Sequence, residues 1–331
     1  MSSESSAPLL QSPPIAPGSV HDRAVPAEPE AATGTVPGTA SSSVVQIVTD
    51  YVSLTKPGIL SLLLATTLAG MMVAAEGFPP FALVLWTLLG GVLSAGGANA
   101  LNCYIDRDID KLMARTRNRP SASGRIAPRK VLIFGIALTV ISFFILAIFA
   151  NFLAAGLALL GAFYYVVVYS YYLKRRTPQN IVIGGAAGAM PPVVGWAAVT
   201  GSLSVAPILM FALIYYWTPP HFWALALLKK GDYGRAEVPM LPNVAGEKET
   251  RRQIILYTLL MVAVSMLLMP FGLGEIYFVS ALVLNAIFLI LSFQLYRTGS
   301  KHFARLTFFY SLWYLALIFA AMVVDRLVLG G

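Results

Sequence analysis

The sequence contains very little cysteine, histidine or charge. Its 331 residues include one cysteine, Cys103, and three histidines, so an intrachain disulfide and a metal site built from several cysteines or histidines are excluded. Charged residues make up 11% of the chain and hydrophobic residues 57%. A soluble globular domain carries roughly twice this charged fraction, at about 25%. The composition therefore indicates a helical protein that crosses a membrane several times.

Apolar runs of about twenty residues, the length that a helix needs to cross a bilayer, recur through the chain after residue 50. They predict an all-α polytopic membrane protein. No Asp, Glu, Lys or Arg lies in the middle of any run, although transporters of ions or protons commonly place ionisable groups there. The predicted spans are 57–75, 81–104, 131–149, 152–172, 181–199, 205–228, 254–272, 274–296 and 305–324.

The N-terminal segment differs from the rest of the chain because it is rich in Ser, Pro, Ala and Gly. Such a segment cannot bury enough apolar surface to offset its ordering entropy, so we expect a disordered tail over 1–45. One transmembrane domain is expected over 46–331. The tail lacks the apolar core of a signal peptide, and its acidic residues argue against a mitochondrial transit peptide. These features favour a bacterial inner membrane as the location.

Lysine and arginine gather in alternate connections between the predicted spans. The connections near Glu76, Asn151, Thr200 and Leu273 contain neither residue. By the positive-inside rule, we expect the basic connections and the N-terminus in the cytoplasm and the C-terminus in the periplasm. The net charge of +8 is explained by this topology, and we expect no nucleic acid as a partner.

Three oxygen-bearing side chains follow the second predicted span at a spacing of four: Asn102, Asp106 and Asp110. On a continuous helix they lie within an arc of about 80°, whereas Asp108 points elsewhere. Mg²⁺ prefers oxygen ligands and commonly bridges a few carboxylates to the phosphates of a substrate. The stripe therefore predicts a magnesium and phosphate site. An ordinary solvated helix end is the alternative.

A second polar patch, KKGDYGRAEVPMLP at 229–242, follows the sixth predicted span. Four predicted helices separate it from the stripe, so both patches are expected at the same side of the membrane. Each patch combines acidic and basic residues, which suits a polyanion bound through metal and direct cationic contacts. An isoprenyl diphosphate, with its head at the membrane edge and its tail among the helices, fits this arrangement.

Six strings in order resemble the UbiA superfamily of intramembrane prenyltransferases, a bundle of nine transmembrane helices, and in particular its haem-farnesylating members. The resemblance covers nearly everything after residue 50. The strings are LTKPGI at 54–59, NCYIDRDID at 102–110, RTRNRP at 115–120, GGAAGAMPPVVGWAAVTG at 184–201, YWTPPHFWALAL at 216–227 and DYGRAEVPMLP at 232–242.

The resemblance implies a reaction in which farnesyl diphosphate alkylates a vinyl group of haem B and water supplies a hydroxyl, giving haem O and diphosphate. It assigns diphosphate binding through Mg²⁺ to Asn102, Asp106 and Asp110, and a related role to Asp232. The second acidic motif departs from the family pattern, because Ala236 stands where many members repeat an aspartate. A haem A synthase acting downstream is implied as a possible partner.

Cationic and aromatic side chains complete the predicted site. Cations stabilise negative charge that develops on a leaving diphosphate, and aromatic rings stabilise an allylic cation while excluding water. His221 follows two prolines that are expected to disturb its helix, and it is either a haem-iron ligand or a hydrogen-bonded packing residue. The predicted substrate-binding residues are Lys56, Arg115, Arg119, Lys174, Lys230, Arg235, His221, Tyr216 and Trp217.

Two other functions remain open from the sequence. The acidic motifs recognise only the diphosphate, so another UbiA-type enzyme acting on a quinone precursor or a chlorin would carry the same motifs. A haem carrier or transporter without catalysis is the alternative from a different class. The strings around Pro191 and His221 distinguish these possibilities by sequence, and detection of haem O distinguishes them by experiment.

Overall fold

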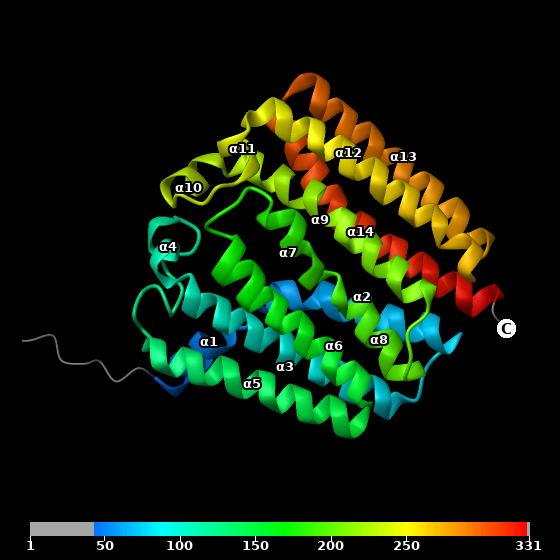
Figure 1. Cartoon of the computed structure of the whole chain (residues 1–331), viewed down its shortest axis with the longest axis horizontal. Helices are drawn as coiled ribbons and strands as arrows, with labels where there is room; N and C mark the ends of the chain where they lie inside the picture. Colours follow the sequence, from blue (N-terminus) through cyan, green and yellow to red (C-terminus); the bar gives the residue numbers. More distant parts are fainter. Residues whose placement is uncertain (1–42, 330–331) are drawn as a thin grey trace, which may run out of the picture. The chain divides into compact units, whose positions relative to one another are not determined.

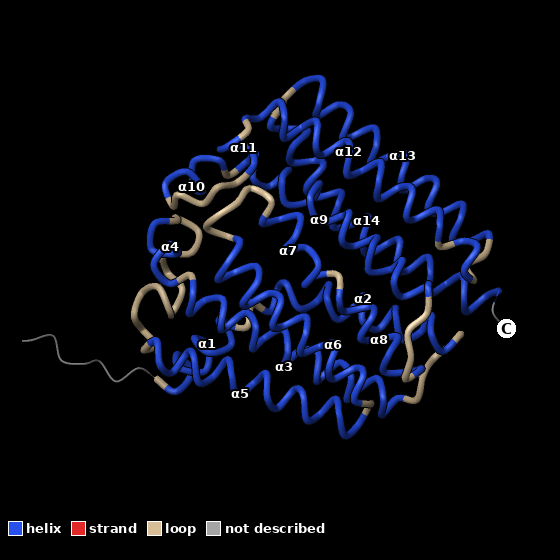
Figure 2. The backbone as a smooth tube through the Cα atoms, viewed as in Figure 1, coloured by secondary structure: helices blue, strands red, loops and turns tan. Residues whose placement is uncertain are grey.

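The computed structural model describes residues 43–329, and every regular element among them is a helix (Figure 2). The chain divides into two units, Met1–Ser41 and Ser42–Gly331, and the described residues all belong to the second. The predicted tail, 1–45, lies outside the described residues except for its last three. For the part that the structure describes, the all-α architecture confirms the predicted class.

Both long and short helices occur along the described part of the chain (Figure 1). The α-helices are α1 (Val44–Leu54), α2 (Pro57–Ala75), α3 (Phe81–Ile105), α4 (Arg107–Leu112), α5 (Pro128–Phe149), α6 (Phe152–Phe163), α7 (Asn180–Gly188), α8 (Met190–Thr200), α9 (Val205–Leu228), α10 (Lys230–Arg235), α11 (Leu241–Val244), α12 (Gly246–Leu267), α13 (Glu275–Thr298) and α14 (Lys301–Leu329). A π-helix, η1 (Tyr164–Leu173), continues α6, and a short 3₁₀ helix, η2 (Met269–Phe271), follows α12.

The predicted spans correspond to the long helices. Eight helical segments within 43–329 are long and apolar enough to cross a membrane. The ninth is α9, which has 24 residues but contains Pro219, Pro220 and His221 among its apolar residues. Several helices extend beyond their predicted ends. For example, α12 begins at Gly246 instead of residue 254, because its first turns carry charged residues that hydropathy excludes from a span.

Two local features differ from uniform α-helical spans. The fifth span is divided at Ala189, just before Pro191 and Pro192, into α7 and α8. The second half of the fourth span is the π-helix η1, a form that apolar periodicity does not distinguish from an α-helix. By contrast, α9 continues through its two prolines, and the hydroxyl of Thr218 donates to the Ile214 carbonyl at 2.8 Å within the preceding turn.

Small residues bring α2 and α8 into close contact. A β-carbon added to Gly195 would lie 2.1 Å from the carbonyl oxygen of Thr67, and one added to Gly70 would lie 2.4 Å from that of Pro192. The two backbones therefore meet directly, which is how helices commonly pack inside membranes. α8 also contacts α6 and α9, α9 contacts α12 and α14, and α14 contacts α2. These contacts join the helices of the described unit into one bundle.

The charged segments gather at one end of the bundle. α4, α10 and α11 lie together at the left of Figure 1, where α3, η1 and α9 also end. An apolar cluster joins the α4 region to the loop after α10 through Ile109, Met113, Ala236, Val238 and Met240. The two polar patches, far apart in the sequence, are thus neighbours, as the alternation of the spans predicts.

Candidate active site

The three residues of the predicted stripe lie on one buried face where α3 meets α4. The helix is interrupted at Asp106, yet the backbone N–H of Asp106 donates to the Asn102 carbonyl at 2.9 Å and that of Asp110 to the Asp106 carbonyl at 2.8 Å. The spacing of one turn is therefore kept across the interruption. The side chains of Asp106 and Asp110 are 0% and 3% exposed, and that of Asp108 is 60% exposed. The predicted one-sided geometry is confirmed.

Asp108 belongs to a surface ion pair. Both of its carboxylate oxygens accept hydrogen bonds of 2.6 Å from the guanidinium of Arg175. The hydrogen bonds from Arg175 lower the pKa of Asp108 to about 2. Both partners are exposed, and an exposed pair of this kind contributes only about 0–1 kcal/mol to stability. Asp108 is therefore separate in its contacts from the buried stripe.

Asn102 is held by a complete set of hydrogen bonds. Its amide nitrogen donates to Asp106 Oδ2 at 2.7 Å and to Ser170 Oγ at 2.8 Å. Its amide oxygen accepts a hydrogen bond of 2.7 Å from Lys56 Nζ. The hydroxyl of Ser170 in turn donates to the Tyr165 carbonyl at 2.8 Å. With both amide hydrogens engaged, the oxygen of Asn102 is oriented toward cations.

Only one of the two carboxylate oxygens of Asp106 has a hydrogen-bond or ion-pair partner among the described residues. Its Oδ2 accepts from Asn102 and forms an ion pair of 2.5 Å with Lys174 Nζ. Its Oδ1 is buried and has no hydrogen-bond partner among the described residues. A buried carboxylate oxygen without a partner is costly, because it has lost its hydration without compensation. Asp106 Oδ1 is therefore a candidate cation ligand.

Two further cations reach the stripe from the segments on either side of it. Arg119 Nη1 donates to Asp110 Oδ1 and Oδ2 at 3.0 and 2.8 Å. Lys56, between α1 and α2, has a left-handed backbone with φ of 55°, which costs a non-glycine residue roughly 1–2 kcal/mol. Burial lowers the pKa of Lys56, since desolvation disfavours its charged form. In this strained backbone conformation, the side chain of Lys56 contacts Asn102.

The π-helix η1 places two of the groups that contact the stripe. The backbone N–H of Lys174, which follows η1, donates to the Tyr169 carbonyl five residues earlier, at 2.9 Å. This widened turn allows Ser170 to contact Asn102 while Lys174 contacts Asp106. The sequence predicted Lys174 but missed Ser170. The only sequence feature that marks Ser170 is a hydroxyl within an apolar span, and that feature alone is weak evidence for a site residue.

The second acidic patch lies beside the stripe but is more exposed. Asp232 pairs with Arg235 within α10, and Lys230 pairs with Glu247 at 3.0 Å. Burial raises the pKa of Tyr233, an effect that nearby Arg115 partly offsets. Arg115 itself is exposed. None of these predicted residues makes a hydrogen bond or ion pair with the stripe among the interactions of residues 43–329.

Glu237 does not replace the missing second aspartate in a buried position. It is exposed and has a left-handed backbone with φ of 52°, whereas the adjacent Ala236 is buried in the cluster that joins the two patches. The apolar side chain at 236 therefore serves packing between the patches. Asp232 remains the predicted acidic ligand of this patch.

The predicted aromatic and histidine residues form a separate group on α9. The ring of His221 lies between Trp217 at 4.5 Å and Phe308 at 4.8 Å, measured between centroids, and both pairs are stacked. His221 Nδ1 is 2.7 Å from Ser311 Oγ, whose own hydrogen is donated to the Phe308 carbonyl at 2.6 Å. This geometry assigns the proton to Nδ1 and leaves Nε2 with a lone pair.

The other two aromatic residues differ in their exposure. Trp217 is buried, and its indole N–H donates to the Ser311 carbonyl at 2.8 Å. Tyr216 is partly buried and contacts the rings of Tyr215 and Tyr257 at 5.3 and 6.3 Å. Neither residue makes a hydrogen bond with the stripe in the described part of the chain, so the predicted site residues fall into three groups: the stripe with its cations, the second patch and the aromatic group on α9.

The stripe has the composition of a hard-cation site. Within residues 43–329, no group of three or more Asp, Glu, His or Cys side chains is placed to hold a metal ion. The stripe offers two carboxylates and an amide oxygen, and a site that binds Mg²⁺ together with a phosphate needs only one or two protein carboxylates. The unpartnered Oδ1 of Asp106 is consistent with such an ion.

The charges around the stripe favour an additional anion. Lys56, Lys174 and Arg119 are three cations, and Asp106 and Asp110 are two anions, which leaves one positive charge in a largely buried position. A buried excess charge is unfavourable without a partner. The arrangement can therefore bind a polyanionic group, with a divalent cation between it and the carboxylates.

Comparison with known proteins agrees with the fold and the motifs. The model of the UbiA prenyltransferase family matches residues 63–321. The chain is 52% identical over 309 residues to the protoheme IX farnesyltransferase of Roseiflexus castenholzii, covering 92% of this chain and 58% of that one. It is 52% identical over 280 residues to the protoheme IX farnesyltransferase of Synechocystis, covering 84% of this chain and 89% of that one.

The chain differs in length from several of these relatives, and its fold resembles that of a solved structure. The chain spans about half the length of the first curated relatives that it matches, at 49–58%. A solved UbiA homolog from Archaeoglobus fulgidus, bound to DMAPP and Mg²⁺, superposes with a TM-score of 0.62 at 17% identity, covering 83% of this chain and 99% of that one. At this identity the likeness concerns the fold alone. From its sequence match and its helical fold, the chain belongs to the UbiA prenyltransferase family.

Proposed function

We propose that this protein transfers the farnesyl group of farnesyl diphosphate to a vinyl group of haem B, with hydration, giving haem O and diphosphate. The observation that carries the prenyl diphosphate part is the buried stripe, in which three cations meet two carboxylates at the charged end of an apolar bundle. The haem part is supported by the 52% identity to the protoheme IX farnesyltransferase of Synechocystis.

The proposed reaction balances as an alkylation followed by hydration. The allylic C–O bond of farnesyl diphosphate breaks, and its electron pair leaves with the diphosphate. The vinyl π electrons of haem form the new C–C bond, and water then adds to the resulting cation and loses a proton. Negative charge develops on the leaving group, so preorganised cations there lower the barrier. Lys56, Lys174 and Arg119 are the proposed direct contacts to the diphosphate.

Asn102, Asp106, Asp110 and Asp232 are the proposed ligands of Mg²⁺. Their oxygens are the ligand type that this ion prefers, and the buried Oδ1 of Asp106 has no other partner. The A. fulgidus relative was solved with Mg²⁺ and a prenyl diphosphate, which supports the same pairing here. When bound, Mg²⁺ supplies Lewis-acid stabilisation of the leaving diphosphate.

The second patch is proposed to complete the diphosphate site. It contributes Lys230 and Arg235, and Arg115 joins them from the loop after α4, to which the patch is connected by the shared apolar cluster. Lys230 and Arg235 are now paired with carboxylates at the surface, and exchange of such weak pairs for a polyanion is inexpensive. Asp232 would then be released from Arg235 to take its part in ion binding.

His221, Tyr216 and Trp217 are proposed to contact haem. The tautomer of His221 supports a role as haem-iron ligand, because Nε2 keeps the lone pair that such a ligand needs. Its ring is held in place by stacking on Trp217. Tyr216 is only partly buried and extends the aromatic surface of α9. Transfer of the product to a haem A synthase is a further proposal that rests on the proposed reaction.

The chain is an integral membrane protein, and we propose the bacterial inner membrane as its location. The active-site end of the bundle carries the lysines and arginines, so it is proposed to face the cytoplasm, with the C-terminus in the periplasm. The domain proposed to carry the activity comprises residues 46–331.

The direct test is an incubation of the purified protein in detergent with haem B, farnesyl diphosphate and Mg²⁺, followed by chromatography and mass spectrometry of the pigments. We expect a pigment whose mass exceeds that of haem B by one farnesyl group and one hydroxyl. Consumption of a quinone precursor instead would assign the chain to another UbiA-type enzyme. Haem binding without any product would assign it to a haem carrier.

A further inference from the structure

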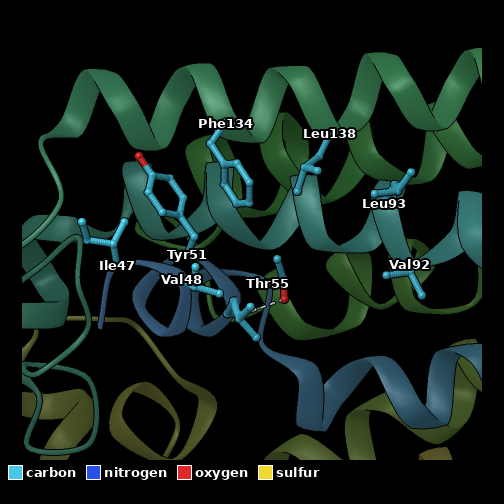
Figure 3. Close-up of a pocket in the computed structure, with 9 residues that line it drawn as sticks. Ile47, Val48, Tyr51, Thr55, Val92, Leu93, Phe134 and Leu138 are labelled. Carbon is cyan, nitrogen blue, oxygen red and sulfur yellow. Dashed lines mark hydrogen bonds between the residues drawn. The ribbon is translucent and has the colours of Figure 1, made fainter. Parts of the chain in front are cut away.

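An apolar groove of about 310 Å³ lies between α1, α3 and α5, away from the polar stripe (Figure 3). Its walls include Val48, Tyr51 and Val52 from α1, Val92 from α3, and Phe134 and Leu138 from α5. No residue of the stripe and none of its three cations lines it. The groove is therefore a second apolar space that the proposed reaction does not use.

The groove follows the direction of the long helices. Figure 3 shows Phe134 and Leu138 at successive positions along α5, with Tyr51 beside Phe134 and the α3 residues farther along. The rings of Tyr51 and Phe134 meet edge to face at 4.9 Å. If a methylene group takes about the space of a water molecule, roughly 30 Å³, the groove holds on the order of ten methylene groups. This size and direction fit an acyl chain.

The outer wall of the groove is an amphipathic helix at the charged end of the bundle. α1 exposes Val44, Val45 and Val48, whereas Asp50 on its other face is buried. Asp50 accepts hydrogen bonds from Arg125 Nε at 2.9 Å and Nη2 at 3.0 Å, which attach α1 to the loop before α5. A short helix with one apolar exposed face and one anchored polar face suits the interface between lipid headgroups and acyl chains.

A lysine lies in register with the groove at its charged end. Lys130, Phe134 and Leu138 occupy positions i, i+4 and i+8 of α5, so they share one face and rise by about 6 Å at each step. Lys130 is exposed and forms no ion pair with any residue from 43 to 329, and its neighbour Arg129 is also exposed. A cation thus precedes the apolar walls by one helical turn, which is the order of a lipid headgroup and its chain.

We propose that this groove binds an anionic phospholipid of the membrane, with one acyl chain between α1 and α5 and the headgroup phosphate at Lys130. The apolar walls account for the chain, and the free cation at their charged end accounts for the preference for an anionic headgroup. Bound lipid would fill the space behind α1. It would thereby support the turn at Lys56, which directly follows α1.

The test is native mass spectrometry of the delipidated full chain in detergent with dioleoyl phosphatidylglycerol or dioleoyl phosphatidylcholine. We expect one phosphatidylglycerol to bind at concentrations at which phosphatidylcholine does not. Leu138→Trp fills the groove and is expected to abolish this binding, whereas Ile148→Trp, at an exposed position of the same helix outside the groove, leaves it unchanged. Lys130→Gln is expected to weaken phosphatidylglycerol binding about fivefold, the contribution of one lysine near an anionic surface.

Lys130→Gln, at an exposed position, keeps the test valid if Leu138→Trp does not fold. Equal binding of both lipids, or unchanged phosphatidylglycerol binding in Lys130→Gln, would overturn the proposal. Displacement of the phosphatidylglycerol by farnesyl diphosphate would assign the groove to the prenyl substrate and would overturn it as well. These readouts measure lipid binding alone, so they do not depend on the haem reaction.

Discussion

Asp106 and Asp108 provide a matched test of the buried stripe, because they are the same residue type two positions apart on opposite sides of the junction between α3 and α4. Asp106→Asn removes a buried charge that pairs with Lys174 at 2.5 Å and retains almost the same shape. Asp108→Asn removes an exposed charge that pairs with Arg175. The two variants have the same change in composition and net charge. A difference in activity between them therefore reports whether the carboxylate lies in the buried stripe or at the surface.

The expected magnitudes follow from burial. The buried carboxylate of Asp106 is proposed to face the ion and the diphosphate, and removing one preorganised group at a site of developing charge costs about 2.7–4 kcal/mol in the transition state. At 1.36 kcal/mol for each factor of ten, kcat/KM for farnesyl diphosphate is expected to fall by roughly 10²–10³ in Asp106→Asn. An exposed pair is worth about 0–1 kcal/mol, so Asp108→Asn is expected to lose no more than about fivefold.

The assay is the rate of farnesylated haem formation in detergent, measured by chromatography over a range of farnesyl diphosphate concentrations. Thermal unfolding of both variants shows whether a loss of rate comes from a loss of folded protein. Asp110→Asn is expected to behave as Asp106→Asn, because Asp110 is equally buried. Losses within about threefold of one another for the substitutions at 106 and 108 would refute the one-sided site.

Three further outcomes are expected. Ser170→Ala removes the acceptor of one Asn102 hydrogen and is expected to raise KM for farnesyl diphosphate about five- to a hundredfold, since a buried donor left unpaired costs about 1–3 kcal/mol; an unchanged KM would argue against a positioning role. Gly195→Ala forces α2 and α8 apart and is expected to destabilise the protein by about 1–3 kcal/mol in thermal unfolding, whereas Gly156→Ala, with open space around it, is expected to be harmless. His221→Ala is expected to change the visible absorption spectrum of bound haem, and an unchanged spectrum would leave His221 as a packing residue.

The helical class and the spans were predictable because they depend on composition and run length, which the bilayer constrains strongly. The stripe was predictable for a similar reason. A spacing of four places residues on one face of a helix even when, as at Asp106, the helix is interrupted. Periodicity alone places Asp106 and Asp108 on different faces, and the folded structure shows that the face of Asp106 is the buried one.

The contacts made by segments distant in sequence were not predictable in the same way. Ser170 contacts Asn102 from η1, a π-helix, and hydropathy does not distinguish that form from an α-helix. The helix α9 is continuous from Val205 to Leu228, as the predicted span 205–228 requires. The disturbance expected at Pro219 and Pro220 does not end it, because neighbouring groups within a bundle can satisfy a backbone that a proline disturbs. Pairing of Lys174 with Asp106 required the folded arrangement of α3 and η1.

The central claim is that the stripe binds a prenyl diphosphate with Mg²⁺. It is tested most directly by equilibrium binding of farnesyl thiodiphosphate, an analogue that resists cleavage, to the purified protein with and without Mg²⁺ and in the absence of haem. We predict Mg²⁺-dependent binding by the native protein, loss of that binding in the combined Asp106→Asn and Asp110→Asn variant, and retention in Asp108→Asn. Binding that persists in the combined variant, or that ignores Mg²⁺, would contradict the account.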